Sequence, residues 1–297
     1  MSDRIAATIE PEPDPLPGML APLRPVVLLL AYLGGLAVWP IRSLAAVAEP
    51  RPTGTLSIRA ATMAQLDWLI LAGLPIVGLV HVGMGSFLSM QAYFGATFEA
   101  GVGPVVGVGL IRNGGPLLSG FILAGLLASR ATVELRTRPR PELDADPGWI
   151  ADRDVALGLR ADDRSGPSDA RATLPRLIAA ALMGPVLAAW GTAVGTFVGY
   201  RIANVVLGIP LETLFDTFAE MLWMRDILGL VVKGMAFGAI AAAVACFEGS
   251  RRDALPPHMA ALRACCLSMA LILGFNLSWF LFAYLAGPAF GPTVLPT

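Results

Sequence analysis

Residues 94–138, FGATFEAGVGPVVGVGLIRNGGPLLSGFILAGLLASRATVELRTR, decide the fold. Within them, residues 104–129 form an apolar run long enough to cross the ~30 Å hydrocarbon core of a bilayer as a helix. Arg112 interrupts this run, and Gly114-Gly115-Pro116 follows shortly after. A charge inside a membrane span is costly, so it faces a partner, a cavity or water. The Gly-Gly-Pro sequence weakens a helix where backbone groups would become free. The stretch therefore predicts a membrane helix with a polar interruption, which is typical of a transporter.

Apolar runs of similar length recur along the rest of the chain. The protein has 297 residues, of which 56% are hydrophobic and only 14% are charged. Ordinary soluble domains are about a quarter charged. Five spans are expected, at residues 68–91, 104–129, 177–200, 227–247 and 264–286. The predicted fold class is therefore an all-α integral membrane protein with five transmembrane helices.

A shorter apolar run precedes the five spans, at residues 25–41, between Arg24 and Arg42. Its 17 residues are marginal for crossing a bilayer and suit a helix that lies in the membrane interface. We therefore expect an N-terminal interfacial helix, and the alternative that this run spans the membrane stays open. If it spans, only the side of the amino terminus changes.

Charge distribution predicts the orientation of the chain. Seventeen arginines lie in residues 1–67, 130–176 and 248–263, whereas the opposite side carries only Arg201 and Arg225. Basic residues accumulate on the cytoplasmic side of membrane proteins. The expected organisation is a disordered cytosolic tail (1–22), an interfacial helix and linker (23–67), a membrane domain (68–286) and a periplasmic tail (287–297). Within the membrane domain, residues 130–176 are expected to form a long cytoplasmic loop.

Several kinds of site are excluded or disfavoured by the sequence. The phosphate-binding motif G-x-x-x-x-G-K-[ST] is absent. The chain's only lysine, Lys233, lies inside a span, and we expect its side chain to snorkel to the outer membrane interface. His81 and His258 are far apart in sequence, and the three cysteines do not form a metal or disulfide pattern. The net charge of −1 gives no indication of nucleic-acid binding. We predict no catalytic residue, metal ligand or cofactor.

Arg112 has two interpretations that the residues alone leave open. Its guanidinium suits bidentate binding of a phosphate group, such as that of a lipid headgroup. Alternatively, it has a structural partner, either Glu99 or backbone carbonyls freed by the Gly-Gly-Pro sequence. Glu248 and Asn276, near or in the last two spans, are expected to form hydrogen bonds between helices.

Several blocks in order resemble the MlaE/YrbE-type permeases of MCE-associated lipid ABC transporters. The first is Gly85, Leu88 and Gln91, followed by Phe94-Gly95-Ala96. The most specific is LIRNGGPLLSGFILAG at 110–125, similar to L-V-R-E-x-G-P-L-L-T-x-x-x-x-A-G. Further similarities are Leu174-Pro175-Arg176, LGIPLETLFD at 207–216, residues 224–249 and RACCLSMALIL at 263–273.

The resemblance implies a permease dimer, with identical or different protomers, that works with a cytosolic ABC ATPase and a periplasmic MCE-domain protein. It implies five spans and an interfacial helix in a bacterial inner membrane. A phospholipid or other hydrophobic lipid would pass through a cavity at the dimer interface. Arg112, Asn113 and Gln91 would line or support that cavity, and Glu142, Leu143 and Asp144 in the long loop would contact the ATPase.

The sequence departs from the family pattern at polar positions. Asn113, Leu126 and Asn276 stand where the family has charged residues, and only Glu142-Leu143-Asp144-Ala145 remains of its E-Q-I-D-A-L coupling element. The predicted function is a lipid-moving permease subunit with ATP hydrolysis on a separate chain. The lost charges also suggest an alternative, a scaffold or assembly subunit that has lost transport.

Overall fold

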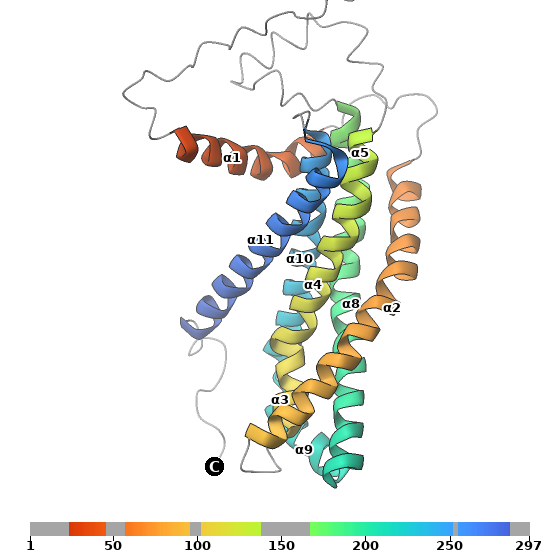
Figure 1. Ribbon diagram of the computed structural model, residues 1–297, viewed down its shortest axis with the longest axis vertical. Coiled ribbons are helices and arrows are strands. Elements are labelled where there is room, and N and C mark those ends of the chain that lie inside the picture. Colours follow the sequence, from red (N-terminus) through yellow and green to blue (C-terminus); the bar gives the residue numbers. More distant parts are fainter. Residues whose placement is uncertain (1–23, 46–56, 96–101, 138–166, 252–254, 286–297) are drawn as a thin grey trace, which may run out of the picture. The chain divides into compact units, whose positions relative to one another are not determined.

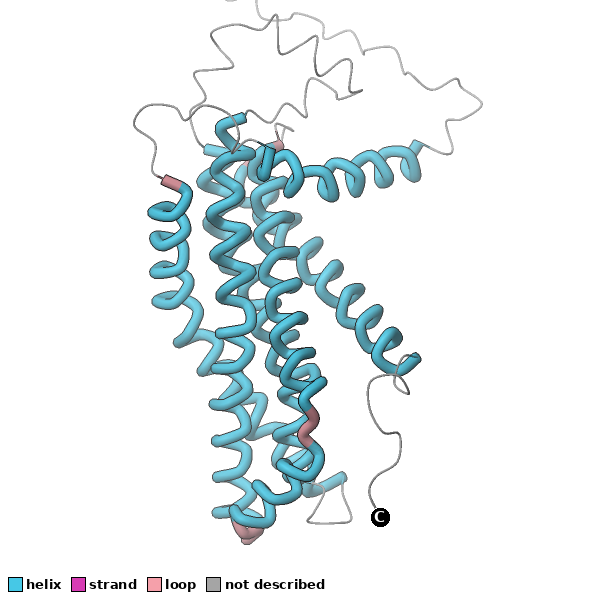
Figure 2. The backbone as a smooth tube through the Cα atoms, turned by 180° about the vertical axis from the view of Figure 1, so that it is seen from behind, coloured by secondary structure: helices cyan, strands magenta, loops and turns pink. Residues whose placement is uncertain are grey.

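The computed structural model describes residues 24–45, 57–95, 102–137, 167–251 and 255–285. All the regular elements in these ranges are helices (Figures 1 and 2). Their bounds are α1 Arg24–Ala45, α2 Ile58–Gly95, α3 Val102–Gly109, η3 Leu110–Gly114, α4 Gly115–Leu127, η4 Ala128–Thr132, α5 Val133–Thr137, α8 Pro167–Leu207, α9 Leu211–Met221, α10 Met224–Ser250 and α11 Pro257–Leu285. The chain divides into two units, residues 1–38 and 39–297, and the second holds the helical bundle.

Six helical segments are long and apolar enough to cross a membrane. Four of them contain a predicted span in full, and the fifth, Pro257–Ala283, overlaps most of the predicted span at 264–286. This confirms the expected all-helical membrane fold. The sixth is α1, which has 22 residues where the sequence predicted 17. Its apolar length from Val26 to Ala45 is sufficient for a span as well as for an interfacial position.

The helices extend beyond the predicted spans into polar sequence. α2 begins at Ile58, ten residues before the expected start of the first span. α5 continues to Thr137 and α8 begins at Pro167, so both ends of the predicted 130–176 loop are helical. A helix formed inside the bilayer can continue into polar sequence, because each further residue adds a backbone hydrogen bond to a turn that already exists. The boundaries set by hydrophobicity were therefore too short.

The predicted interruption at Gly114-Gly115-Pro116 is not a break. Residues 102–137 form one continuous helical segment that changes to π-helical hydrogen bonding at η3 and again at η4. At the end of η3, the backbone N–H of Gly115 bonds the carbonyl of Leu110, five residues back. This widened turn comes immediately before Pro116, which lacks a backbone N–H. The helix accommodates the proline by a π turn instead of unwinding.

α8 packs between α2 and α10 along the centre of the bundle. A side-chain carbon added to Gly184 of α8 would lie 1.9 Å from the carbonyl oxygen of Gly234 on α10. Gly238 similarly approaches the carbonyl oxygen of Ala180, at 2.0 Å from its hypothetical Cβ. Such close backbone contact provides helix association where hydrophobicity does not, because lipid is equally apolar. Gly184, Gly234 and Gly238 therefore mark the α8–α10 contact.

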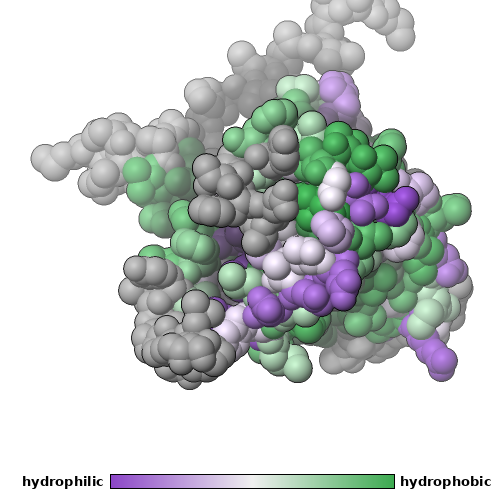
Figure 3. Space-filling model, turned by 90° about the horizontal axis from the view of Figure 1, so that it is seen from below, coloured by the Kyte–Doolittle hydropathy of each residue, from purple (hydrophilic) through white to green (hydrophobic). Residues whose placement is uncertain are grey.

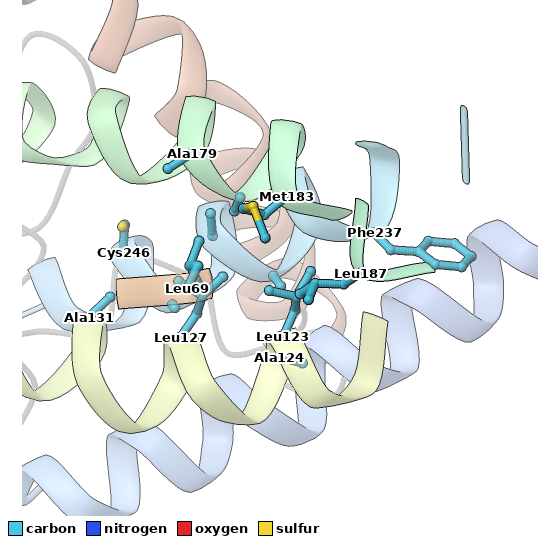
Figure 4. Packing of buried hydrophobic residues seen from close by; sticks show 14 of the residues in the cluster. Leu69, Leu123, Ala124, Leu127, Ala131, Ala179, Met183, Leu187, Phe237 and Cys246 are labelled. Carbon is cyan, nitrogen blue, oxygen red and sulfur yellow. The ribbon is translucent and has the colours of Figure 1, made fainter. Parts of the chain in front are cut away.

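Buried apolar side chains from several helices fill the same region. Figure 4 shows part of this core, to which α2, α4, α8 and α10 contribute most, together with Ala131 of η4, Leu135 of α5 and Ile272 of α11. Leu69, Leu123, Leu127, Leu187 and Phe237 are essentially inaccessible. The core is continuous from the middle of the bundle toward the end at which α5 lies.

α11 is the helix that separates from this core. It packs against α10 near its beginning and diverges from the bundle toward its carboxyl end (Figures 1 and 2). Only a small part of its apolar window is buried within the chain. The divergence places the second half of α11 opposite η3 and the amino-terminal end of α10, where the polar residues gather.

Candidate functional site

The π-helical segment η3 presents Arg112 to the first turn of α10. The Arg112 Nε lies 2.9 Å from Asp226 Oδ1, and its Nη2 lies 3.0 Å from Asp226 Oδ2. This bidentate arrangement is the strongest form of an arginine–carboxylate contact. The Arg112 side chain keeps 44% of its surface exposed, whereas Asp226 keeps 6%. Asp226 is therefore buried, whereas the Arg112 guanidinium is accessible.

Asp226 also closes the amino-terminal end of α10. Its Oδ2 accepts a hydrogen bond from the backbone N–H of Trp223, at 3.1 Å. A carboxylate in the first turn of a helix is stabilised by the free N–H groups there and by the helix dipole. Asp226 thus fixes Arg112 and the start of α10 at the same time.

Lys233 completes the polar cluster two turns further along α10. Its Nζ donates to the backbone carbonyl of Arg112 and, at 3.0 Å, to Asn113 Oδ1. The residue is only 4% exposed. The expectation that Lys233 snorkels to the interface was wrong, because the carbonyl and amide oxygens of η3 provide polar partners inside the bundle. A buried ammonium requires such partners.

A cavity of about 490 Å³ opens beside this cluster, between η3, α10 and α11. Its polar wall contains Arg112, Asn113, Asp226 and Lys233 together with Arg225. Its apolar wall is made by Leu228, Gly229, Trp279, Phe280, Phe282 and Ala283. Figure 3 views the molecule from the end nearest α3 and α9, where hydrophilic residues gather among broad hydrophobic areas. The cavity therefore suits an amphipathic ligand.

A second cavity of about 390 Å³ adjoins the first, because both include Asn113 and Phe280. It is otherwise lined by α11 residues, including Leu277 and Asn276. The Oδ1 atom of Asn276 is buried and has no hydrogen-bond partner within the described residues. This oxygen therefore does not meet the expected role of Asn276 in helix-to-helix hydrogen bonding within the described residues, although the residue lines the smaller cavity.

Arginine–carboxylate contacts also hold the opposite end of the bundle. Glu134 of α5 binds both Arg130 and Arg176, each at 2.7 Å. Arg130 also lies over the ring of Trp68 on α2, with its guanidinium carbon 4.4 Å from the ring centre. These contacts join α2, η4, α5 and α8 at the point where residues 138–166 leave and rejoin the described helices.

A second group at that end surrounds Glu248, which is fully buried. Its carboxylate pairs with Arg263 of α11, with 2.6 Å between Nε and Oε2. Arg136 donates from Nη1 to the backbone carbonyl of Glu248 and from Nε to that of Leu255. The prediction that Glu248 links helices is confirmed, and its partners are arginines.

The structure brings only two of the predicted site residues together. Arg112 and Asn113 line the larger cavity together. Gln91 is exposed near the end of α2 and is not among the residues that line either cavity, so its association with Arg112 stays a prediction. Glu142, Leu143 and Asp144 lie outside the described residues, and so does Glu99. Among the described residues, the structural partner of Arg112 is Asp226.

Sequence reasoning missed Asp226 and Arg225. Both are at the edge of a predicted span, where charged residues are common and attract no attention. The available signal was spacing: Asp226 and Lys233 are seven residues apart and so lie on one face of a helix. A helix face with two charged residues would have been the place to look for a partner of Arg112, the charge in the second predicted span.

A model of the family described as Permease MlaE matches residues 62–145 and 168–282. The chain belongs to the MlaE permease family. The matched residues include η3, with Arg112 and Asn113, and all of α10. The family expected from the sequence blocks is therefore confirmed.

Relatives of this MlaE-family chain are described as transporter components. A probable ABC transporter permease of Rickettsia bellii is 24% identical over 224 residues, covering 74% of this chain and 79% of the relative. A probable ABC transporter permease of Rickettsia typhi is 26% identical over 190 residues, covering 63% and 68%. The chloroplast protein TRIGALACTOSYLDIACYLGLYCEROL 1 of Arabidopsis thaliana is 28% identical over 148 residues, covering 50% and 38%.

These matches define the protein as the permease subunit of an ABC transporter, a multi-pass membrane component without catalytic residues of its own. A permease of this class works with an ATPase. The MlaE-family chain thus contributes the membrane part, and the polar cluster beside η3 is its candidate substrate site.

Proposed function

We propose that this permease moves a phospholipid or another hydrophobic lipid between the bacterial inner membrane and periplasmic MCE proteins. The observation that carries this proposal is the two-sided cavity beside η3. A headgroup would face Arg112 and Asn113, and acyl chains would lie against Trp279 and Phe280. A wall of aromatic and aliphatic groups with few placed polar groups is typical of a ligand site. The name of the Arabidopsis relative, which is that of a galactolipid, also supports a lipid cargo.

The loop end of the bundle is proposed to receive the ATPase. The ion pair between Glu134 and Arg176 holds the two helices that flank residues 138–166. A force applied to the intervening segment would therefore reach α5 and α8 together. Glu142, Leu143 and Asp144 are the proposed contact residues within it.

The remaining partners and the orientation follow from the family and the charge distribution. A second permease protomer, identical or different, would complete the lipid path, and the second half of α11 offers an extensive exposed apolar surface to lipid or protein. The arginine-rich ends would be cytoplasmic, with the amino terminus inside and an MCE-domain protein on the periplasmic side.

The test is reconstitution of the purified permease with its ATPase in lipid nanodiscs. We expect ATP hydrolysis to respond to added lipid and Arg112→Ala to abolish this response, because the variant removes the accessible cation of the cavity. Arg201→Ala is the matched control, since Arg201 is exposed on α8 and lines neither cavity.

A hydrolysis rate that ignores lipid and is unchanged by Arg112→Ala would favour the alternative function, a non-transporting scaffold or assembly subunit. The neutral residues Asn113 and Leu126 are the reason to keep that alternative in the experiment. Failure to copurify any ATPase or MCE-domain protein would contradict the transport proposal itself.

A further inference from the structure

The polar wall of the larger cavity carries an excess of positive charge. Arg112, Arg225 and Lys233 are cations, and Asp226 is the only acidic residue among the described residues that line it. Asn113 is neutral. A low-dielectric surrounding increases the effect of an uncompensated charge. The cavity is therefore complementary to a group with a net negative charge.

The excess charge is accessible at two guanidinium groups. Arg112 uses Nε and Nη2 for Asp226, and its Nη1 makes no hydrogen bond within the described part of the chain. Arg225 has no carboxylate partner among the described residues, and its guanidinium carbon lies 5.5 Å from the ring centre of Trp223. A cation–π contact of this kind uses the face of the ring and leaves the N–H groups of the guanidinium available.

Lys233 has a different part in this arrangement. Its Nζ is occupied by the Arg112 carbonyl and Asn113 Oδ1, and the residue is buried. It contributes positive potential without offering a free donor to a ligand. Arg112 and Arg225 are thus the groups that would touch a headgroup.

We propose that this cavity selects lipids whose headgroup has a net negative charge, and that Arg225 is a specificity-determining residue for this selection. The proposal rests on the proposed lipid function of the same site. A zwitterionic headgroup brings its own ammonium among three cations, whereas an anionic one brings an uncompensated phosphate. Guanidinium groups bind a phosphate in bidentate geometry.

The experiment measures lipid binding to the full-length permease in detergent by native mass spectrometry. Phosphatidylglycerol and phosphatidylcholine with identical acyl chains are the probes. We expect phosphatidylglycerol to bind about tenfold more tightly, a difference of about 1.4 kcal/mol. Arg225→Gln should weaken phosphatidylglycerol binding more than phosphatidylcholine binding, and so remove most of this preference. Arg201→Gln, a change of the same charge away from the cavity, should leave the preference intact.

A second variant tests the charge argument without altering Arg225. Asn113→Glu adds a carboxylate to the same wall and should reduce phosphatidylglycerol binding as Arg225→Gln does. Equal binding of the two lipids by the unmodified chain, or a preference unaffected by both variants, would overturn charge selection and leave the lipid function standing. Failure to bind either lipid would contradict the lipid function as well.

Inorganic phosphate distinguishes a lipid headgroup from a free anion. Millimolar phosphate should not displace phosphatidylglycerol, because the apolar wall holds the acyl chains. Displacement by phosphate alone would assign the cations to a soluble anion and overturn the proposal.

Discussion

The two ends of α10 carry the same kind of interaction in opposite surroundings. In its first turn Asp226 binds Arg112, and in its last turn Glu248 binds Arg263. Arg112 is nearly half exposed and borders a cavity. Glu248 is fully buried, and Arg136 and Arg263 surround it. One pair is therefore available to a ligand, whereas the other closes a helix junction.

Helix polarity explains part of this difference. A carboxylate at the amino-terminal end of a helix is stabilised by the helix dipole, whereas one at the carboxyl-terminal end is destabilised. Asp226 thus remains stable with one partially solvated arginine. Glu248 depends on its arginines, because burial and the dipole both act against its charge. Of the two pairs, the one that borders a cavity and keeps a donor accessible is the one that could bind a ligand.

The largest effect on stability is expected from Glu248→Gln. Glu248 is fully buried whereas the Arg263 side chain is 34% exposed. Removal of the carboxylate therefore leaves a partly solvated arginine without its acidic partner, which should cost about 3 kcal/mol in the free energy of unfolding, at the lower end for breaking a buried pair. Thermal unfolding of the purified chain in detergent measures the change. Glu134→Gln is the matched control, since Glu134 is exposed in the same half of the bundle. Equal stability of the two variants would refute the distinction between a closed and an open pair.

A smaller loss of stability is expected from Asp226→Asn, about 2 kcal/mol, because water can reach Arg112 and an amide oxygen can still accept from Trp223. Its effect on transport should be larger than its effect on unfolding. Lipid-stimulated ATP hydrolysis of the reconstituted complex measures the former. If Glu248→Gln, compared at a temperature where both variants are folded, reduced hydrolysis to the same extent, the assignment of transport to the cavity end would be wrong.

The sequence predicted the helical membrane fold because hydrophobic length is a local property. It also identified Arg112 as exceptional, since a charge within an apolar run is visible without a structure. The helix ends were misjudged because polar segments such as those around Arg59 and Arg136 continue the backbone pattern of α2 and α5. Hydrophobicity marks the bilayer boundary, which is not the end of the helix.

The partners of Arg112 could not be assigned from sequence. Asp226 is 114 residues away in the sequence, and Arg112 lies inside the π turn of η3, whose geometry a regular helical periodicity does not predict. Two glycines and a proline indicate a weakened helix without deciding between a break and a π turn. The long-range packing of α10 against η3 decides it.

Lys233→Met tests how far the cavity end depends on buried hydrogen bonds. Methionine keeps a similar volume but leaves the Arg112 carbonyl and Asn113 Oδ1 without their donor, which should cost about 1.5 kcal/mol. Thermal unfolding gives the stability, and native mass spectrometry gives lipid binding by the same sample. Anionic lipid should bind several-fold more weakly, since the wall loses one positive charge. Unchanged stability would show that the Lys233 contacts contribute nothing to the packing of α10 on η3.

The smallest effect on stability is expected from Glu134→Gln, below about 1 kcal/mol, because exposed ion pairs are compensated by water. The variant nevertheless separates Arg130 and Arg176, which Glu134 joins next to the segment proposed to meet the ATPase. We therefore expect normal lipid binding and normal unfolding, together with a weaker response of ATP hydrolysis to lipid. Arg201→Gln should change none of these quantities. If ATP hydrolysis by the variant responded to lipid as the unmodified complex does, the Glu134 ion pairs would hold the helices together without transmitting motion. The two ends of the bundle would then differ only in how accessible their ion pairs are.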